Sequence, residues 1–136
     1  MDLTSNDIDF DLLAEDLALF SGDEFVEQAL QRGVDLKKYS EKWDRKIIFT
    51  EYGFKSSDYN VSGMQDDKTK VANMNNQFNG YRAFFETIWK EDFFAGGFLW
   101  KWTFFPNEQN SGMKNARYTP QGKPAYGLIR DVYGAR

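Results

Sequence analysis

Apolar residues recur along this chain in two kinds of pattern. In the stretches that predict helices they repeat with helical spacing, at residues 9–20, 23–43, 71–90 and 125–133. In the stretches that predict buried strands they form short continuous runs, at residues 47–50 and 95–103. The polar stretches between these elements, residues 55–70 and 104–118, are interpreted as long surface loops.

This order of helices and strands predicts an α/β fold with a parallel sheet. Two parallel strands do not make a stable sheet alone, because parallel sheets are buried on both faces and their edges need partners. A complete eight-stranded α/β barrel takes roughly 250 residues, and this chain has 136. We therefore interpret residues 1–136 as one partial domain, with residues 1–22 as an N-terminal segment of uncertain role. It would be the C-terminal part of a TIM (β/α)8 barrel, from about helix six to helix eight. The alternative is a small open α/β sheet with a further strand within residues 1–10.

The composition restricts the chemistry. The chain contains no His and no Cys, which excludes Ser-His and Cys-His nucleophiles and thiolate metal sites and argues against a catalytic zinc. Acid–base chemistry must then come from Asp, Glu, Lys or Tyr. We expect neither a cofactor nor a metal.

Charge and hydropathy indicate which partners to expect. A formal net charge of −4 argues against nucleic acid or an anionic membrane surface as the main partner. The sequence has no apolar run long enough to span a bilayer, and no basic segment followed by an apolar one at its start. We expect no membrane span and no signal peptide in this chain. Whether a full-length parent is secreted or cytoplasmic stays open.

Glu51 follows the apolar run of residues 47–50 directly. An ionised carboxylate beside a core is costly unless it is paired or solvated. Catalytic carboxylates are common at the carboxyl ends of strands in a parallel barrel. From this run alone, a catalytic acid and a simply solvated one are about equally reasonable.

Three segments resemble one family. Residues 47–54 (IIFTEYGF) resemble strand seven of retaining glycoside hydrolases with (β/α)8 barrels. Residues 96–102 (GGFLWKW) resemble strand eight of the same group, and residues 119–125 (TPQGKPA) are similar to the segment that opens the last helix. The nearest resemblance is to the β-mannanase-like glycoside hydrolase family 113, over about residues 46–133.

The resemblance implies a site. Glu51 would be the nucleophile that forms a glycosyl-enzyme, and Trp102, or else Trp100, would stack on the sugar. Tyr52 would hydrogen-bond the nucleophile or line the rim. The substrate would be a mannan-like polysaccharide or oligosaccharide.

The resemblance also implies what is missing. In such barrels the acid/base Glu ends strand four, which has no counterpart in this sequence. Glu91 and Asp92 precede the second strand and are expected at the opposite end of the sheet. The remaining candidates are interpreted as solvated loop charges: Asp58, Asp66, Asp67 and Glu108. We therefore expect the isolated chain to be inactive.

Other interpretations remain open. Exposed aromatic residues without a complete catalytic pair would suit a non-catalytic carbohydrate-binding remnant, and the open sheet would suit a small interaction domain. The chain could also function only together with an N-terminal barrel fragment. Unpaired strand edges favour self-association.

Overall fold

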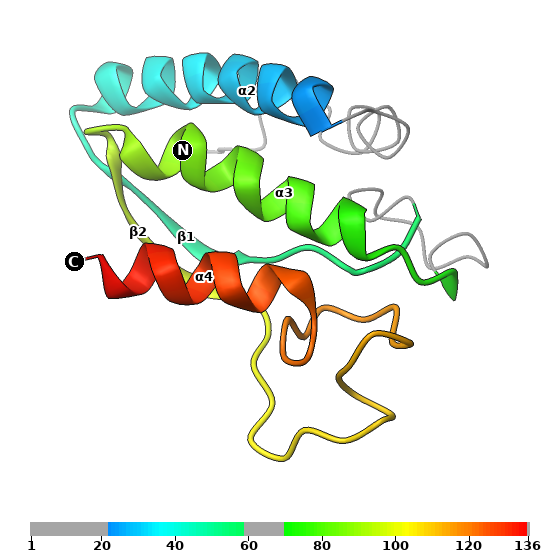
Figure 1. The fold of residues 1–136 in the computed structure, drawn as a ribbon. Helices are drawn as coiled ribbons and strands as arrows, with labels where there is room; N and C mark the ends of the chain where they lie inside the picture. Colours follow the sequence, from blue (N-terminus) through cyan, green and yellow to red (C-terminus); the bar gives the residue numbers. More distant parts are fainter. Residues whose placement is uncertain (1–21, 59–69, 136) are drawn as a thin grey trace.

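The computed structural model describes residues 22–58 and 70–135 (Figure 1). Its elements in chain order are α2 (Gly22–Trp43), β1 (Ile47–Tyr52), α3 (Met74–Glu86), the 3-10 helix η2 (Ile88–Lys90), β2 (Phe94–Leu99) and α4 (Pro124–Gly134). The two strands pair in parallel, and α3 lies between α2 and α4. The predicted α/β order with two parallel strands is confirmed. The predicted helix at residues 9–20 and the alternative strand within residues 1–10 lie outside the described residues.

Local chemistry explains where α3 and α4 begin. Asn73 caps α3, since its side-chain oxygen accepts a hydrogen bond from the Asn76 backbone N–H at 3.1 Å. Pro124 occupies the first turn of α4, where its missing N–H costs no helical hydrogen bond. The predicted helix at residues 71–90 is in fact α3 followed by η2. No helix in the described part of the chain has both the length and the apolar character to cross a membrane.

Both strands differ from their predicted bounds. β1 extends to Tyr52 and therefore includes Glu51, which was predicted to follow the strand. β2 ends at Leu99, so Trp100 and Trp102 lie in the loop that leads to α4. The alternation of side chains along a strand consequently does not determine where the two tryptophans point.

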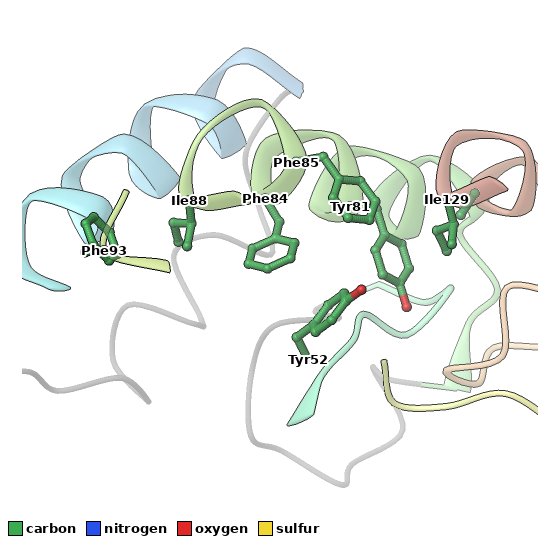
Figure 2. Close-up of a cluster of buried hydrophobic side chains, with 8 residues drawn as sticks. Tyr52, Tyr81, Phe84, Phe85, Ile88, Phe93 and Ile129 are labelled. Carbon is green, nitrogen blue, oxygen red and sulfur yellow. The ribbon is translucent and has the colours of Figure 1, made fainter. Parts of the chain in front are cut away.

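One face of the strand pair carries an aromatic core. Tyr52 of β1 points toward rings contributed by α3 (Figure 2). The ring of Phe84 lies 5.8 Å from that of Phe49 and 4.7 Å from that of Tyr52, measured between centroids. The buried cluster comprises Tyr52, Tyr81, Phe84, Phe85, Ile88, Phe93, Ala125 and Ile129. Aromatic residues make up 18% of the chain, and five of them lie in this buried cluster.

The other face of the strand pair is open. Ile48 is 60% exposed and Phe98 is 68% exposed, although the apolar runs predict burial on both faces. The described helices cover only one side of the strands, which explains the difference. In a complete barrel the uncovered side of the strands faces the filled barrel interior.

Candidate functional site

The position of Glu51 depends on an irregularity in β1. Phe49 lies opposite Gly97 and Tyr52 lies opposite Leu99, so β1 advances by three residues where β2 advances by two. This additional residue is a β-bulge, which re-aims side chains near its position. Phe49 and Tyr52 both pack on the aromatic core, while Glu51 is exposed at the carboxyl end of the strand.

Close backbone contact brings Trp100 beside this strand end. The Trp100 N–H donates to the Tyr52 carbonyl at 2.7 Å. A Cβ atom on Gly53 would lie 1.7 Å from the Trp100 carbonyl oxygen, so only glycine fits there. The peptide bond between Trp100 and Lys101 is cis. The first residue after β2 is thus held directly beside the residues that follow Glu51.

A pocket of about 580 Å³ opens next to this contact. Trp100, Asn115 and Tyr118 are among its lining residues. Burial, and then the negative charge of Glu51, raise the pKa of Tyr118. Tyr118 therefore lies within electrostatic range of Glu51, and Trp100 lines the same pocket as Tyr118.

The two predicted sugar platforms have different neighbours. Trp100 is 45% exposed and Trp102 is 48% exposed, so both rings are accessible. Trp100 lines the pocket, whereas the ring of Trp102 packs 5.7 Å from that of Tyr126 at the start of α4. Their roles in sugar binding stay predictions, but Trp100, which was the second choice, is the one that lines this pocket.

Tyr52 does not occupy the predicted rim position. Its side chain is 7% exposed, and its hydroxyl forms a hydrogen bond with that of Tyr133. The bulge explains the difference, since it turns Tyr52 toward the helices and leaves Glu51 outward. Tyr52 therefore supports the strand that carries Glu51 from the core side.

The other acids are placed much as expected. Glu91 and Asp92 line a second pocket with Arg45 and Lys46, which precede β1, so they lie at the amino ends of the strands. Asp58 accepts a hydrogen bond from the Asn73 side chain at 2.8 Å, next to the cap of α3.

Of the remaining predicted loop acids, the structure describes Glu108 alone. Glu108 is exposed in the loop after β2, and Asp66 and Asp67 lie outside the described residues. Within residues 22–58 and 70–135, no three acidic side chains cluster as a metal site requires.

A buried polar framework, which the sequence pattern did not reveal, positions the loops. The Gln77 side chain donates to the carbonyls of Phe54 at 3.0 Å and Tyr118 at 3.1 Å, joining α3 to both loops. The Lys123 ammonium donates to Ser56 Oγ at 2.8 Å and to the Arg117 carbonyl at 3.1 Å. Two features of the sequence could have indicated this framework. Gln77 lies within the apolar face of a helix, and Lys123 immediately precedes a helix.

A second polar contact closes the loop between β2 and α4 on itself. The Gln121 side chain donates to the Thr103 carbonyl and accepts from the Thr103 N–H, both at 2.8 Å. This pair mimics strand pairing and holds the segment after Trp102 against the start of α4. The next two residues, Phe104 and Phe105, are almost fully exposed.

Comparisons with known proteins agree with this geometry. The family model for Glycoside Hydrolase Family 113 matches residues 12–123. A search of curated proteins finds no match. Among solved structures, the GH113 β-mannanase AaManA from Alicyclobacillus acidocaldarius, in complex with ManMIm, is similar with a TM-score of 0.67 and 23% identity. A GH113 β-1,4-mannanase is similar with a TM-score of 0.70 and 21% identity.

The extent of these matches defines the architecture. The alignments cover 81% and 82% of this chain but 36% of each neighbour's chain. The described elements therefore form part of a (β/α)8 barrel, and the open-sheet alternative is set aside. On the match over residues 12–123, the chain belongs to glycoside hydrolase family 113.

Proposed function

We propose that this chain supplies the nucleophile-bearing, C-terminal part of a retaining β-mannanase-like glycoside hydrolase. The observation that supports this most directly is the exposed Glu51 at the carboxyl end of a parallel strand, beside Tyr118 and Trp100. This end of the strands is where (β/α)8 barrels build their active sites. The names of the similar enzymes, β-mannanase and β-1,4-mannanase, suggest a mannan-like polysaccharide or oligosaccharide substrate.

In the proposed mechanism the Glu51 carboxylate attacks the anomeric carbon, and the bond to the leaving-group oxygen breaks. A second carboxyl group, about 5–5.5 Å from the first, protonates that oxygen and later deprotonates the attacking water. Water then releases the sugar from Glu51 with its original configuration. We assign the second carboxyl to the part of the barrel that lies outside this chain's 36% share of the neighbours' length.

Exposed aromatic rings would provide the sugar contacts. Trp100 lies beside the pocket and Trp102 lies over the start of α4, and both are accessible. Flat aromatic surfaces with a few polar groups are typical of ligand sites. The Trp100 ring would stack on the sugar that Glu51 attacks, and the Trp102 ring would contact a more distant sugar unit.

A second candidate function is carbohydrate binding without hydrolysis. The accessible rings of Trp100 and Trp102 favour it. The expected lack of an acid/base partner for Glu51 among the described residues favours it as well. Quenching of tryptophan fluorescence by manno-oligosaccharides, with no turnover under any condition below, would favour this alternative.

The first test is activity of the chain alone. We expect no measurable hydrolysis of an aryl β-mannoside, because protonation of the leaving group lacks its donor. Hydrolysis by the chain that Glu51→Gln abolishes would contradict this expectation.

The second test places the chain in a complete barrel. This chain replaces the corresponding segment of a GH113 β-1,4-mannanase, and circular dichroism checks the fold of the hybrid. We expect hydrolysis that Glu51→Ala abolishes and that Glu108→Ala, at an exposed loop position, does not. Retained activity in Glu51→Ala would overturn the proposal.

Azide distinguishes the nucleophile from the acid/base. In the Glu51→Ala hybrid, azide would displace an activated leaving group directly and give the α-mannosyl azide. If Glu51 were the acid/base, azide would instead open a glycosyl-enzyme and give the β-mannosyl azide. Nuclear magnetic resonance of the product reads the configuration.

A further inference from the structure

The pocket beside Glu51 concentrates positive charge. Five of the nine described residues that line it are cationic, and none of those nine is acidic. The cations are Lys55, Lys70, Lys101, Lys114 and Arg117. The chain as a whole has a net charge of −4, so this pocket runs against the general charge of the protein. A cleft lined by charge of one sign attracts ligands of the opposite sign.

Three of the five pocket cations have no carboxylate partner among the described residues. Lys101, Lys114 and Arg117 form no ion pair with any acid in the described ranges. Ion pairs are found instead on α2, for example between Lys37 and Glu41, and on α4. These three cations are therefore available to a ligand.

Aromatic faces accompany the cations. The Lys55 ammonium lies 5.5 Å from the ring centroid of Tyr118, and the Lys101 ammonium lies 5.5 Å from that of Trp100. Contact with a ring face positions an ammonium group without neutralising it. The pocket thus combines flat apolar surface with hydrogen-bond donors of positive charge.

The pocket wall is held by its own hydrogen bonds. Asn115 Oδ1 accepts from the Arg117 N–H at 2.9 Å, and Asn115 Nδ2 donates to the Gln109 carbonyl at 2.8 Å. Behind this wall the buried Lys123 ammonium donates to the Arg117 carbonyl at 3.1 Å. The backbone that carries Lys114 and Arg117 is therefore fixed before any ligand arrives.

We propose that this pocket binds the anionic group of an acidic carbohydrate, such as the carboxylate of a uronate residue. Lys and Arg form strong charge-assisted hydrogen bonds with carboxylate and phosphate oxygens. The role of Trp100 as a sugar platform at the pocket edge rests on the proposed function. The anion site does not, because it rests on the cations alone. The Glu51 carboxylate would repel the carboxylate of a uronate at the attacked position. The uronate would therefore occupy the sugar unit next to the attacked one.

The test compares ligands that differ in charge. The full chain is titrated calorimetrically with a neutral manno-oligosaccharide, with an oligomannuronate of the same length, and with inorganic phosphate. We expect the oligomannuronate to bind about tenfold more tightly than the neutral sugar, or better. This preference should shrink as salt is raised from about 50 to 500 mM, because mobile ions screen exposed charges.

Two double variants locate the effect. Lys114→Ala with Arg117→Ala removes two pocket charges and should abolish most of the preference for the oligomannuronate. Lys37→Ala with Lys38→Ala removes two exposed charges from α2 and should keep it. If the pocket variant does not fold, the salt series on the unaltered chain still decides whether the preference for the oligomannuronate is electrostatic.

The outcomes separate this inference from the proposed function. Equal binding of the neutral and acidic sugars would overturn the anion site and leave the sugar site standing. Binding of the acidic sugar without the neutral one would support the anion site and count against the proposed sugar platform. Phosphate binding as tightly as the oligomannuronate would overturn the assignment to a carbohydrate. Absence of binding by all three would overturn the inference entirely.

Discussion

At the scale of single residues, Gly53 determines how the two strand ends meet. A Cβ atom there would lie 1.7 Å from the Trp100 carbonyl oxygen, which belongs to backbone and cannot rotate away. The same contact includes the hydrogen bond from the Trp100 N–H to the Tyr52 carbonyl. Gly53 therefore holds Trp100 beside Glu51 although it takes part in no chemistry.

Gly53→Ala should destabilise the chain by about 3 kcal/mol or more, because backbone must move to admit the methyl group. Urea denaturation measures the change. The matched control is Gly127→Ala in α4, where a Cβ atom would meet nothing within 4 Å. This control should be neutral or stabilising by up to about 1 kcal/mol. Equal stability of the two variants would contradict the close approach.

At the scale of elements, the loops after β1 and β2 are joined by buried polar side chains. Lys123 reaches Ser56 in the first loop and Arg117 in the second, and Gln77 reaches both loops from α3. Buried groups left without such partners cost about 1–3 kcal/mol each. These contacts give the site loops a rigidity that strand pairing would otherwise provide.

Lys123 also makes stability depend on pH. Burial lowers its pKa to about 8 from the ordinary 10.5, so between these values the unfolded chain binds more protons than the folded chain. Stability should therefore rise with pH from about 8 to 10.5 relative to a Lys123→Met variant. Below pH 8 the cost of burying the charge is fully present.

Urea titrations of both proteins at several pH values measure this difference. Lys90→Met, at an exposed position of η2, controls for the loss of one lysine charge. A difference between the original chain and Lys123→Met that stays constant across this range would show that Lys123 is not desolvated.

At the scale of the whole molecule, the described structure is incomplete as a barrel. Its two strands have a covered face and an open face, and the similar enzymes are more than twice as long, since 81% of this chain aligns with 36% of the neighbour's chain. Parallel strands with open edges and an apolar face favour association. In a complete (β/α)8 barrel this face lies against the filled interior, so in the isolated chain we expect a second copy to cover it.

We therefore expect the isolated chain to self-associate, as light scattering would detect. Ile48→Lys with Phe98→Lys places charges on the open face and should shift the chain toward monomer. Leu30→Lys is the control, because Leu30 is 53% exposed on α2, away from the strands. A monodisperse monomer of the unaltered chain would contradict this prediction.

The sequence by itself determined the elements and the class of fold. Helical and strand periodicities are local properties, so α2, α3, α4 and the two strands could be located to within a few residues. The three segments at residues 47–54, 96–102 and 119–125 also sufficed to identify the family. The lack of His and Cys restricts the chemistry whatever the fold.

Only the tertiary structure decided where the side chains of the site point. The bulge that turns Tyr52 inward and leaves Glu51 exposed is a relation between two strands, and residue spacing in one strand does not encode it. The same holds for the placement of Trp100 and Trp102, for the buried contacts of Lys123, and for the cations around the pocket. These residues are distant in sequence, and only chain packing brings them together.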